Sequence, residues 1–347
     1  MKKILFAGGG SLGHIAPSIA VWNTFKQNDN EAEAHFVCST SKLDTNFLKS
    51  ESIPYSTIDA PRIGISFIWK FWKAVSESKK IIKREKINIV FSKGGHVSIP
   101  VCFAAKKMKI PIVLHESDAV LGRANKIIAK WADVLCMGMQ TKCDSCKNIK
   151  VTGNPIRETI TKGSKEKGFQ LTGLKEGVPI LMVIGGSQGS EALNEAINMN
   201  IDSVITKCQI IHITGAGKSG SNNRDGYFCI EFAHEQLPHL YAITDLALTR
   251  AGANLISELS ANKIKTILVP LRGVGHDHQQ KNAEAIESNA HFTVLQQKDL
   301  SEKLLQKIEE TIESLQQKGV LEEHKNTAAQ EISEIIHEVL DSSCHPL

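Results

Sequence analysis

The chain has 347 residues, of which 41% are hydrophobic and 22% are charged, with a formal net charge of +4 at pH 7. This length suits two α/β domains of ordinary size, each able to bury its own core. The sequence contains no apolar run close to the roughly 20 residues that a membrane-spanning helix needs, and the apolar run at residues 4–7 is too short for a signal peptide. We therefore expect a protein that is soluble or bound peripherally to a membrane.

Positive charge is concentrated in the first half of the chain. Residues 1–150 contain 23 Lys and Arg against 12 Asp and Glu, whereas residues 151–347 contain 18 against 25. The first half is therefore expected to prefer an anionic surface, and the second half is not.

Short buried strands alternate with helices over residues 1–157. The first strand, at residues 3–7, runs into Gly8, Gly9 and Gly10, and a helix follows. Further strands are expected at residues 34–38, 87–91, 111–114 and 134–137. Because the carboxyl ends of parallel strands meet at one edge of a sheet, the polar loops after these strands should form a site there. The ionisable residues in those loops are His14, His96, His115, Glu116 and Asp118.

Residues 62–86 combine large apolar side chains with lysines. Phe67, Trp69 and Trp72 fall close together, and Lys70 and Lys73 lie between or beside them. Exposed aromatic side chains flanked by lysines suit a membrane interface and anionic lipid head groups. The alternative is a helix that packs its aromatic side chains on the core and leaves its lysines in solvent. The close clustering of the apolar groups favours membrane binding.

A second strand–glycine–helix unit lies in the middle of the chain. The run at residues 180–184 has the length and β-branching of a buried parallel strand, and it leads into Gly185, Gly186, Ser187 and Gly189. Free N–H groups and the positive end of a helix dipole make such a turn an anion site. The spacing matches neither a P-loop nor the full dinucleotide fingerprint, so a tight turn without a ligand is the alternative.

The alternation of strands and helices predicts an α/β fold of two doubly wound, Rossmann-like domains that face a cleft. We expect a first domain at residues 1–157, a polar linker at 158–177 and a second domain at 178–330. A last helix at 331–347 can pack back on the first domain. Strands of the second domain are also expected at residues 209–214, 227–232, 245–249 and 266–270.

Two groups of residues of the types that bind metals are weak evidence for a metal site. Cys143 and Cys146 form a Cys-x-x-Cys without a second pair, which favours reduced thiols over zinc. His276, Asp277 and His278 have no further acidic or cysteine partner nearby, which favours a polar loop. We expect no metal, no cofactor and no nucleic-acid partner.

Six motifs follow one another along the chain in a recognisable order. They are Gly-Gly-Gly-Ser-Leu-Gly-His at 8–14, Gly-Gly-His-Val-Ser-Ile-Pro at 94–100, His-Glu-Ser-Asp at 115–118, Gly-Asn-Pro-Ile-Arg at 153–157, Gly-Gly-Ser-Gln-Gly at 185–189, and Glu258 followed by Gln279 and Gln280. Together they resemble the MurG family of bacterial glycosyltransferases, which have the GT-B architecture. That family transfers N-acetylglucosamine from UDP-N-acetylglucosamine to lipid I, giving lipid II for peptidoglycan synthesis.

The resemblance implies a donor site held mainly by the second domain. Ser187 and the amides of its turn would bind the pyrophosphate, and Arg157 would reach it from the domain junction. Glu258 would bond the ribose hydroxyls. The other substrate-binding residues implied are Ser11, Leu12 and Gly13 closing over the donor, Ala233 for uracil, Ala253, Asn254, Leu255, Ile256 and Ser257 near the phosphates, Gln279 and Gln280 for the sugar, and Asp118 on the acceptor side.

The implied reaction is an inverting displacement at the anomeric carbon by the C4 hydroxyl of the muramyl sugar. It needs a base for the hydroxyl and stabilisation of the departing UDP, which helix N-termini and an arginine can supply without a metal. His14 is the candidate base because imidazole titrates near neutral pH, and Asp118, Glu116 and His96 are its competitors. Taken alone, a histidine at that place is more often only a residue of the helix start.

The chain departs from the family pattern at Leu12, His96, Asp118, Ala251 and Gly275, where the family has glycine, tyrosine, asparagine, serine and histidine. Donor-side motifs match better than acceptor-side motifs, so two alternatives stay open. One is transfer to another membrane lipid, such as a diacylglycerol; the other is a UDP-N-acetylglucosamine 2-epimerase with the same two-domain plan. The resemblance also implies peripheral binding to an anionic membrane at the cytoplasmic face of the cell membrane, with cell-wall synthesis proteins as further partners.

Overall fold

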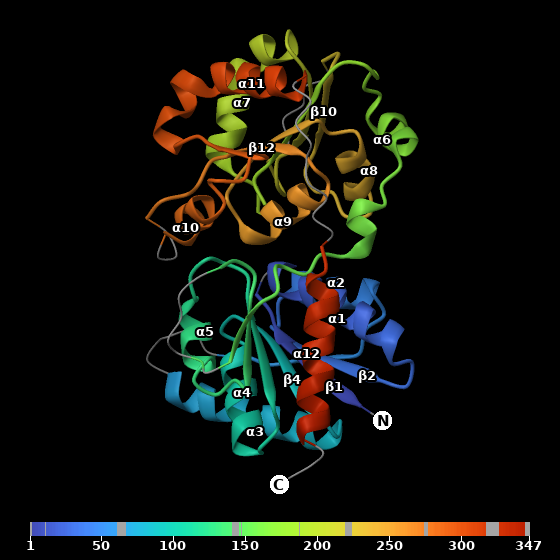
Figure 1. Cartoon of the computed structure of the whole chain (residues 1–347), viewed down its shortest axis with the longest axis vertical. Coiled ribbons are helices and arrows are strands. Elements are labelled where there is room, and N and C mark those ends of the chain that lie inside the picture. The colour runs from blue at the N-terminus through green and yellow to red at the C-terminus, as the bar shows by residue number, and fades with distance from the viewer. Residues whose placement is uncertain are drawn as a thin grey trace. The chain divides into compact units, whose positions relative to one another are not determined.

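The computed structural model describes residues 2–10, 12–60, 67–140, 146, 148–186, 188–218, 224–273, 277–316 and 326–343. The chain forms two compact units (Figure 1). Unit 1 comprises Met1–Arg157 and Asn326–Leu347, and unit 2 comprises Glu158–Lys325. Each unit is built around its own parallel sheet.

The sheet of unit 1 has seven strands in the order β3-β2-β1-β4-β5-β6-β7. These strands are β1 (Lys3–Gly8), β2 (Glu33–Cys38), β3 (Tyr55–Thr57), β4 (Ile89–Gly94), β5 (Ile112–Glu116), β6 (Val134–Met137) and β7 (Ile149–Val151). The chain moves outward from β1 first on one side and then on the other, so the topology switches between β1 and β4. In such sheets ligands bind beyond the carboxyl ends of the two switch strands.

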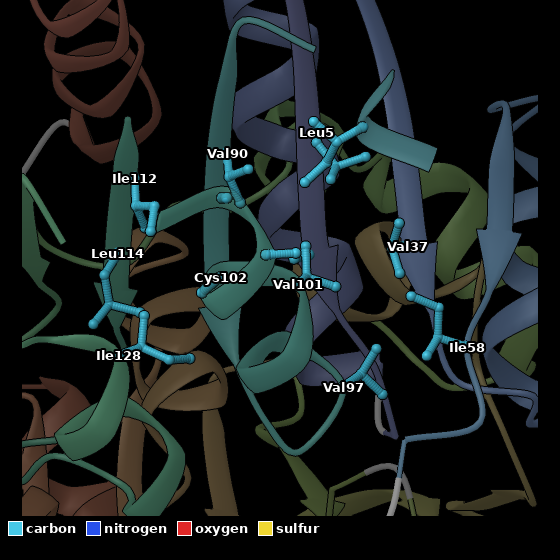
Figure 2. Packing of buried hydrophobic residues seen from close by; sticks show 14 of the residues in the cluster. Leu5, Val37, Ile58, Val90, Val97, Val101, Cys102, Ile112, Leu114 and Ile128 are labelled. Carbon is cyan, nitrogen blue, oxygen red and sulfur yellow. The ribbon is translucent and has the colours of Figure 1, made fainter. Parts of the chain in front are cut away.

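Side chains of β1 alternate between two hydrophobic cores, one on each face of the sheet. Leu5 and Ala7 belong to the core covered by α3, α4 and α5, which Figure 2 shows around Val101 of α4. Ile4 and Phe6 belong to the core covered by α1, α2 and α12. The helices of unit 1 are α1 (Leu12–Asn28), α2 (Lys42–Ser50), α3 (Phe67–Arg84), α4 (Ser98–Lys107), α5 (Arg123–Ile128) and α12 (Ala328–Ser343).

The last helix, α12, belongs to unit 1 although unit 2 precedes it in the sequence. Ile332, Ile336 and Leu340 recur at helical spacing and are buried in the core of unit 1. The ring of His337 stacks on that of Phe25 in α1, with 4.0 Å between the ring centroids. The chain therefore returns to its first sheet after completing the second.

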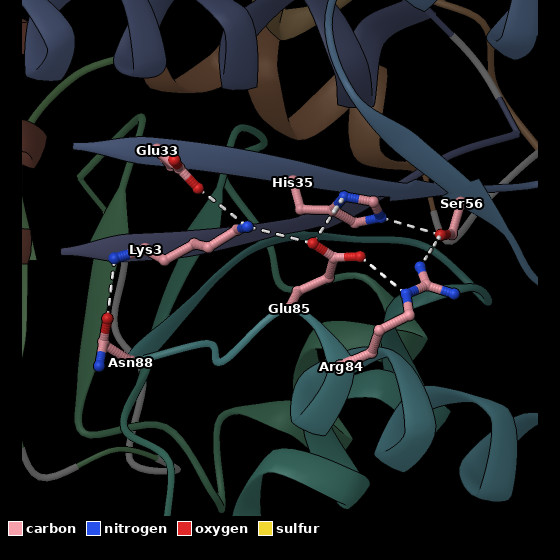
Figure 3. Close-up of polar contacts among 7 residues, drawn as sticks. All are labelled: Lys3, Glu33, His35, Ser56, Arg84, Glu85 and Asn88. Atoms are coloured by element: carbon pink, nitrogen blue, oxygen red, sulfur yellow. Dashed lines mark hydrogen bonds and ion pairs between the residues drawn. The ribbon is translucent and has the colours of Figure 1, made fainter. Parts of the chain in front are cut away.

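A polar network ties the end of α3 to the first strands of unit 1 (Figure 3). Lys3 Nζ lies 2.9 Å from Glu33 Oε2 and 3.1 Å from Glu85 Oε2, and Arg84 Nε donates to Glu85 Oε1. Ion pairs near a protein surface contribute little to the free energy of folding. The network joins the end of α3 and the residue after it to β1 and β2.

The sheet of unit 2 has six strands in the order β10-β9-β8-β11-β12-β13. They are β8 (Ile180–Ile184), β9 (Gln209–Ile213), β10 (Tyr227–Ile230), β11 (Leu246–Thr249), β12 (Lys265–Leu268) and β13 (Phe292–Val294). Leu181 and Val183 face one core, and Met182 and Ile184 face the other. The helices are η1 (Glu158–Thr161), α6 (Lys165–Thr172), α7 (Glu191–Ile205), α8 (Leu237–Ala242), α9 (Ala253–Ala261), α10 (His278–Ala285), η3 (Gln297–Asp299) and α11 (Leu300–Gln316).

The predicted class of two doubly wound α/β domains is confirmed.

The segment 158–177, expected to be a polar linker, is instead partly helical and begins unit 2. Ser164 caps α6 by accepting a hydrogen bond from Lys167 N, and its own N–H donates to His239 Nδ1 at 2.9 Å. A Cβ at Gly168 would lie 2.4 Å from the carbonyl oxygen of His239, so α6 can approach α8 only because glycine stands there. Tertiary contact with α8 therefore decides the structure of a segment whose composition favours a loop.

The sequence pattern does not predict β3, β7 and β13. Each has three residues and lies at an edge of its sheet. Three residues are too few for a strand periodicity to appear. Pairing with the neighbouring strand therefore determines where these edge strands form.

Candidate functional site

The first glycine turn, which joins β1 to α1, is held by an acidic side chain. Asp44 of α2 is fully buried, and its Oδ2 accepts hydrogen bonds from Gly10 N at 2.7 Å and from Ser39 Oγ at 2.6 Å. A Cβ at Gly9 would lie 2.7 Å from Ser39 N, so a side chain there has no room. The carboxylate of Asp44 therefore occupies an N–H group that this turn could otherwise offer to a bound anion. The candidate Ser11 lies outside the described residues.

His14 lies in the first turn of α1, after Leu12 and Gly13. It is half-buried, and its Nδ1 lies 3.1 Å from the carbonyl oxygen of Lys93. Because a carbonyl oxygen only accepts hydrogen bonds, Nδ1 carries the hydrogen and Nε2 keeps its lone pair. Burial, and after it the charge of Lys93, lower the pKa of His14, so its ring is neutral at pH 7. A neutral imidazole of this tautomer can accept a proton at Nε2.

Two glycines leave room for His14 beside the turn after β4 and for His96 beside the first glycine turn. A Cβ at Gly95 would lie 3.5 Å from His14 Nε2, and a Cβ at Gly10 would lie 3.3 Å from His96 Cε1. Both imidazoles therefore lie where β1 and β4 end. The structure thus brings together two of the residues that the sequence analysis proposed as a base.

Glu116 ends β5 and is buried, with both carboxylate oxygens engaged. Its Oε1 accepts from Asp118 N at 3.1 Å, and its Oε2 accepts from Gly122 N at 2.9 Å and from Asn125 Nδ2 at 2.8 Å. Burial raises the pKa of Glu116, and the hydrogen bond from Gly122 N opposes this. Glu116 therefore shapes the loop after β5 and is a poor candidate for the base. Asp118 is half-buried, and its charge raises the pKa of His14.

A buried lysine that the sequence motifs did not single out adjoins these groups. Lys93 is 2% exposed, and its Nζ lies 2.7 Å from His115 Nδ1 and donates to Ser117 Oγ. His115 Nε2 lies 3.0 Å from the carbonyl oxygen of Gly153. Burial lowers the pKa of Lys93 to about 8. The one signal in the sequence is a charged residue placed between a buried strand and Gly94.

Arg157 ends the first segment of unit 1 and lies against α2 and the residue after it. Its Nη1 lies 3.7 Å from Glu51 Oε1, and its guanidinium carbon lies 5.8 Å from the ring centroid of Phe47. An arginine over an aromatic face gains a cation–π contact in addition to the ion pair. These contacts hold the guanidinium close to the surface of unit 1.

The second glycine turn joins β8 to α7 and has strict steric limits. Gly189 has φ +69°, and a Cβ there would lie 1.9 Å from the carbonyl oxygen of Thr214. A Cβ at Gly185 would lie 2.3 Å from Ser190 N. Only glycine fits at both positions. The candidate Ser187 lies outside the described residues.

The N-cap side chain of α7 is turned away from the helix amides. Ser190 Oγ accepts a hydrogen bond from Arg250 Nε at 2.9 Å and caps no amide of the described helix. Arg250 is buried, and its Nη1 donates to the carbonyl oxygen of Val269 at 3.1 Å. A fixed positive charge thus lies beside a helix N-terminus, and both features favour an anion at the second turn.

Glu258 lies in α9, which begins directly after Gly252. Its Oε2 accepts a hydrogen bond from Tyr241 OH at 2.9 Å, and the residue is half-buried. Its carboxylate is therefore held in one orientation while part of the side chain stays accessible. Among the other candidates in this helix, Ala253 and Ile256 are buried, and Asn254, Leu255 and Ser257 are half-buried.

Gln279 and Gln280, at the start of α10, brace the loop after β12. Gln279 Oε1 accepts from Leu271 N at 3.0 Å, and Gln280 Oε1 accepts from Arg272 Nε at 3.2 Å. Both side chains are therefore oriented by that loop. Ala233, the candidate for uracil, is buried shortly after β10.

The described residues include no group of three or more His, Cys, Asp or Glu arranged to hold a metal ion. Cys143 and His276, which belong to the two weak metal motifs, lie outside the described residues, as does Gly275.

The start of α3 exposes apolar side chains beside lysines. Ile68, Trp69 and Trp72 are 67%, 85% and 54% exposed, and Lys70 and Lys73 are also exposed. We call these five residues the α3 patch. Among the helices that the structure describes, none has both the length and the apolar character needed to cross a bilayer.

One aromatic residue of α3 packs inward instead. Phe71 packs against the core of unit 1, and Trp72 and Phe71 each contact the ring of Phe103 edge-to-face. Phe103 in turn contacts Trp131, with 5.5 Å between the ring centroids. The expected aromatic cluster thus divides into a packed part and an exposed part. Phe67 begins the helix, but its side chain is outside the described part of the structure.

Two family descriptions match successive parts of the chain. The glycosyltransferase family 28 N-terminal domain matches residues 4–137, and the glycosyltransferase family 28 C-terminal domain matches residues 180–339. A UDP-N-acetylglucosamine--N-acetylmuramyl-(pentapeptide) pyrophosphoryl-undecaprenol N-acetylglucosamine transferase from Clostridium botulinum (strain Langeland) is 38% identical over 322 residues, which cover 88% of this chain and 90% of that protein. The enzyme of the same name from Clostridium perfringens is 34% identical over an alignment of 355 residues, which covers 99% of this chain and 99% of that protein.

Solved structures share the fold at lower identity. The crystal structure of MurG from Acinetobacter baumannii has a TM-score of 0.73 at 21% identity, covering 97% of this chain and 100% of that one. UDP-GlcNAc 2-epimerase from Methanocaldococcus jannaschii has a TM-score of 0.67 at 15% identity, with the same coverage of 97% and 100%. At these identities the likeness shows the fold alone.

Proposed function

The chain belongs to glycosyltransferase family 28 and, within it, to the family of lipid I N-acetylglucosaminyltransferases, and we propose that it converts lipid I to lipid II for peptidoglycan synthesis. In this reaction N-acetylglucosamine passes from UDP-N-acetylglucosamine to the C4 hydroxyl of the muramyl sugar, with inversion at the anomeric carbon. The observation that carries the proposal is 38% identity along 88% of the chain to enzymes named for this transfer. The 2-epimerase shares the fold at only 15% identity.

The donor nucleotide fits unit 2. An anion at the second glycine turn would meet the N-terminus of α7 and lie near the buried guanidinium of Arg250, and both favour a pyrophosphate. We assign the pyrophosphate to this turn, including Ser187, and the ribose to Glu258, whose carboxylate Tyr241 holds in place. Further donor contacts are assigned to Ser11, Leu12, Gly13, Arg157, Ala233, residues 253–257, Gln279 and Gln280.

The transfer step needs a proton acceptor and stabilisation of the leaving group. We assign the base to His14: its Nε2 takes the proton of the acceptor hydroxyl while its Nδ1–H stays on the carbonyl of Lys93. As the hydroxyl oxygen bonds to the anomeric carbon, the bond to UDP breaks and negative charge develops on the pyrophosphate. The N-terminus of α7 and Arg250 stabilise that charge, and Asp118 stabilises the imidazolium that forms.

The α3 patch is the proposed membrane contact. Lipid I is anchored in the bilayer, so the enzyme must come to its acceptor at the membrane surface. The exposure of Trp69 and Trp72 beside Lys70 and Lys73 supports docking on anionic lipids at the cytoplasmic face. The excess of positive charge in the first half of the chain, 23 against 12, supports the same orientation.

Replacing Glu258 with alanine should weaken UDP binding by ~1.5–3 kcal/mol, because it removes a charge-assisted hydrogen bond to the ribose. Calorimetric titration with UDP measures the change. Glu287→Ala, which removes an exposed carboxylate of the same unit, is the matched control and should bind UDP as the wild type does. An unchanged affinity in the Glu258 variant contradicts the ribose assignment.

Purified protein with radiolabelled UDP-N-acetylglucosamine and lipid I tests the proposed reaction. Label that enters the lipid extract only when lipid I is present supports it. Label that enters the extract with a diacylglycerol and not with lipid I means a transferase for another lipid. Conversion of the free sugar nucleotide to its 2-epimer without any acceptor means an isomerase instead.

A further inference from the structure

Lys93 is a charged group beside the candidate base whose side chain the proposed transfer step does not use. It stands near the end of β4 and is 2% exposed. An ammonium group is almost never buried unless partners compensate for the loss of water. Its partners here are His115 Nδ1 at 2.7 Å and Ser117 Oγ, and both belong to the segment that ends β5.

The titratable groups that face Lys93 come from other parts of unit 1. Burial lowers the pKa of Lys93, and Glu116 at the end of β5, Asp118 in the loop after it and Cys136 in β6 oppose this more weakly. His14 on α1 and His115 on β5 also interact with it, and the charge of Lys93 lowers the pKa of both imidazoles. With a pKa of about 8, Lys93 is mainly an ammonium at pH 7 and loses its proton as the pH rises above that value.

The hydrogen bonds of this ammonium determine how its neighbours are arranged. An ammonium only donates, so His115 Nδ1 must accept, and His115 Nε2 must carry the hydrogen that it donates to the carbonyl oxygen of Gly153. The carbonyl of Lys93 itself accepts from His14 Nδ1. One residue thus contacts the candidate base through its main chain and the segment leading to Asp118 through its side chain.

We propose that Lys93 is a positioning residue of the transfer reaction, whose buried ammonium holds the 115–118 segment in register with the imidazole that its own main chain orients. The proposal rests on the proposed transferase function. A buried charge is a costly way to join two strands, because well-packed apolar residues of similar volume usually stabilise a core as well or better. Precise placement of reacting groups explains its presence better, since misplacement by about 1 Å can lower a rate ~10²-fold.

Replacement of Lys93 with methionine keeps most of the side-chain volume and removes the ammonium. We expect turnover with lipid I at pH 7 to fall at least ~10-fold, with UDP affinity almost unchanged because the donor is assigned mainly to unit 2. We also expect wild-type turnover to fall as the pH rises through about 8, and this basic-side loss to be absent in the variant. Lys49→Met, which removes an exposed lysine of α2, is the matched control and should keep both the turnover and the pH profile of the wild type.

Ser117→Ala tests the proposal by a second route, which also decides it if the methionine variant does not fold. Removing an acceptor of the ammonium lowers the pKa of Lys93, so the basic-side loss should begin at lower pH than in the wild type. A folded Lys93→Met protein with wild-type turnover, or an unchanged pH profile in Ser117→Ala, overturns the positioning role. If the wild type and Lys49→Met transfer no sugar, the proposed function fails, and this inference fails with it.

Discussion

Replacing His14 with alanine should lower the turnover of sugar transfer by ~10²–10⁴-fold and leave the affinity for UDP almost unchanged. The carbonyl of Lys93, 3.1 Å from Nδ1, fixes the tautomer in which Nε2 is free to accept a proton. A methyl group cannot take the proton of the acceptor hydroxyl, whereas the donor is assigned mainly to unit 2. Initial rates at saturating substrates measure the first effect, and calorimetric titration with UDP measures the second.

The pH dependence of turnover gives an independent readout of the same residue. Because burial lowers the pKa of His14, the base form persists to more acidic pH than for an ordinary imidazole, and turnover should fall only as the pH drops through that lowered value. This acid-side loss should disappear in the alanine variant and persist in His96→Ala, which removes the neighbouring imidazole. Weakened UDP binding with normal turnover at saturation would make His14 a donor contact and Asp118 the favoured base.

Local signals were enough to predict the fold class and the position of both glycine turns. Every residue of β8 is buried, as its apolar run between polar segments indicates, because a parallel strand covered on both faces must be apolar throughout. The turn that follows needs a left-handed backbone at Gly186 and Gly189, and glycine adopts it without strain. Both features depend on neighbouring residues only, so they can be read from one short stretch of sequence.

Contacts between distant residues could not be predicted in the same way. Asp44 binds Gly10 across 34 positions, and Lys93 binds His115 across 22 positions. In the sequence, Asp44, Lys93 and His115 are ordinary polar residues of a helix or of a strand end. Their roles appear only when the strand order brings β1, β4 and β5 together. The helical part of the expected linker is a further example, because its structure depends on contact with α8.

The two faces of α3 also could not be told apart from the sequence, and they lead to a prediction about membrane binding. Trp69 and Phe71 are two positions apart, yet Trp69 is 85% exposed and Phe71 packs against Phe103 of α4. The sequence marks both as aromatic, and only the neighbouring helix determines which one is covered. A large indole left in solvent beside lysines suits insertion at the level of lipid head groups, where its apolar body and polar N–H are both accommodated.

Replacing Trp69 and Trp72 with serine, together with Lys70 and Lys73 with glutamine, should lower partitioning onto anionic liposomes by on the order of 10²-fold or more. Each lysine contributes ~1 kcal/mol near such a surface, and the indoles add apolar burial. Phe71 is retained so that the core of unit 1 stays packed, and UDP affinity should not change. Met199→Ser with Lys298→Gln removes an 81% exposed apolar residue and a lysine from unit 2, and this control should still bind.

Because added salt screens exposed charges, wild-type binding should also weaken with ionic strength. Binding that survives the four substitutions, or that ignores salt, would place the docking face elsewhere.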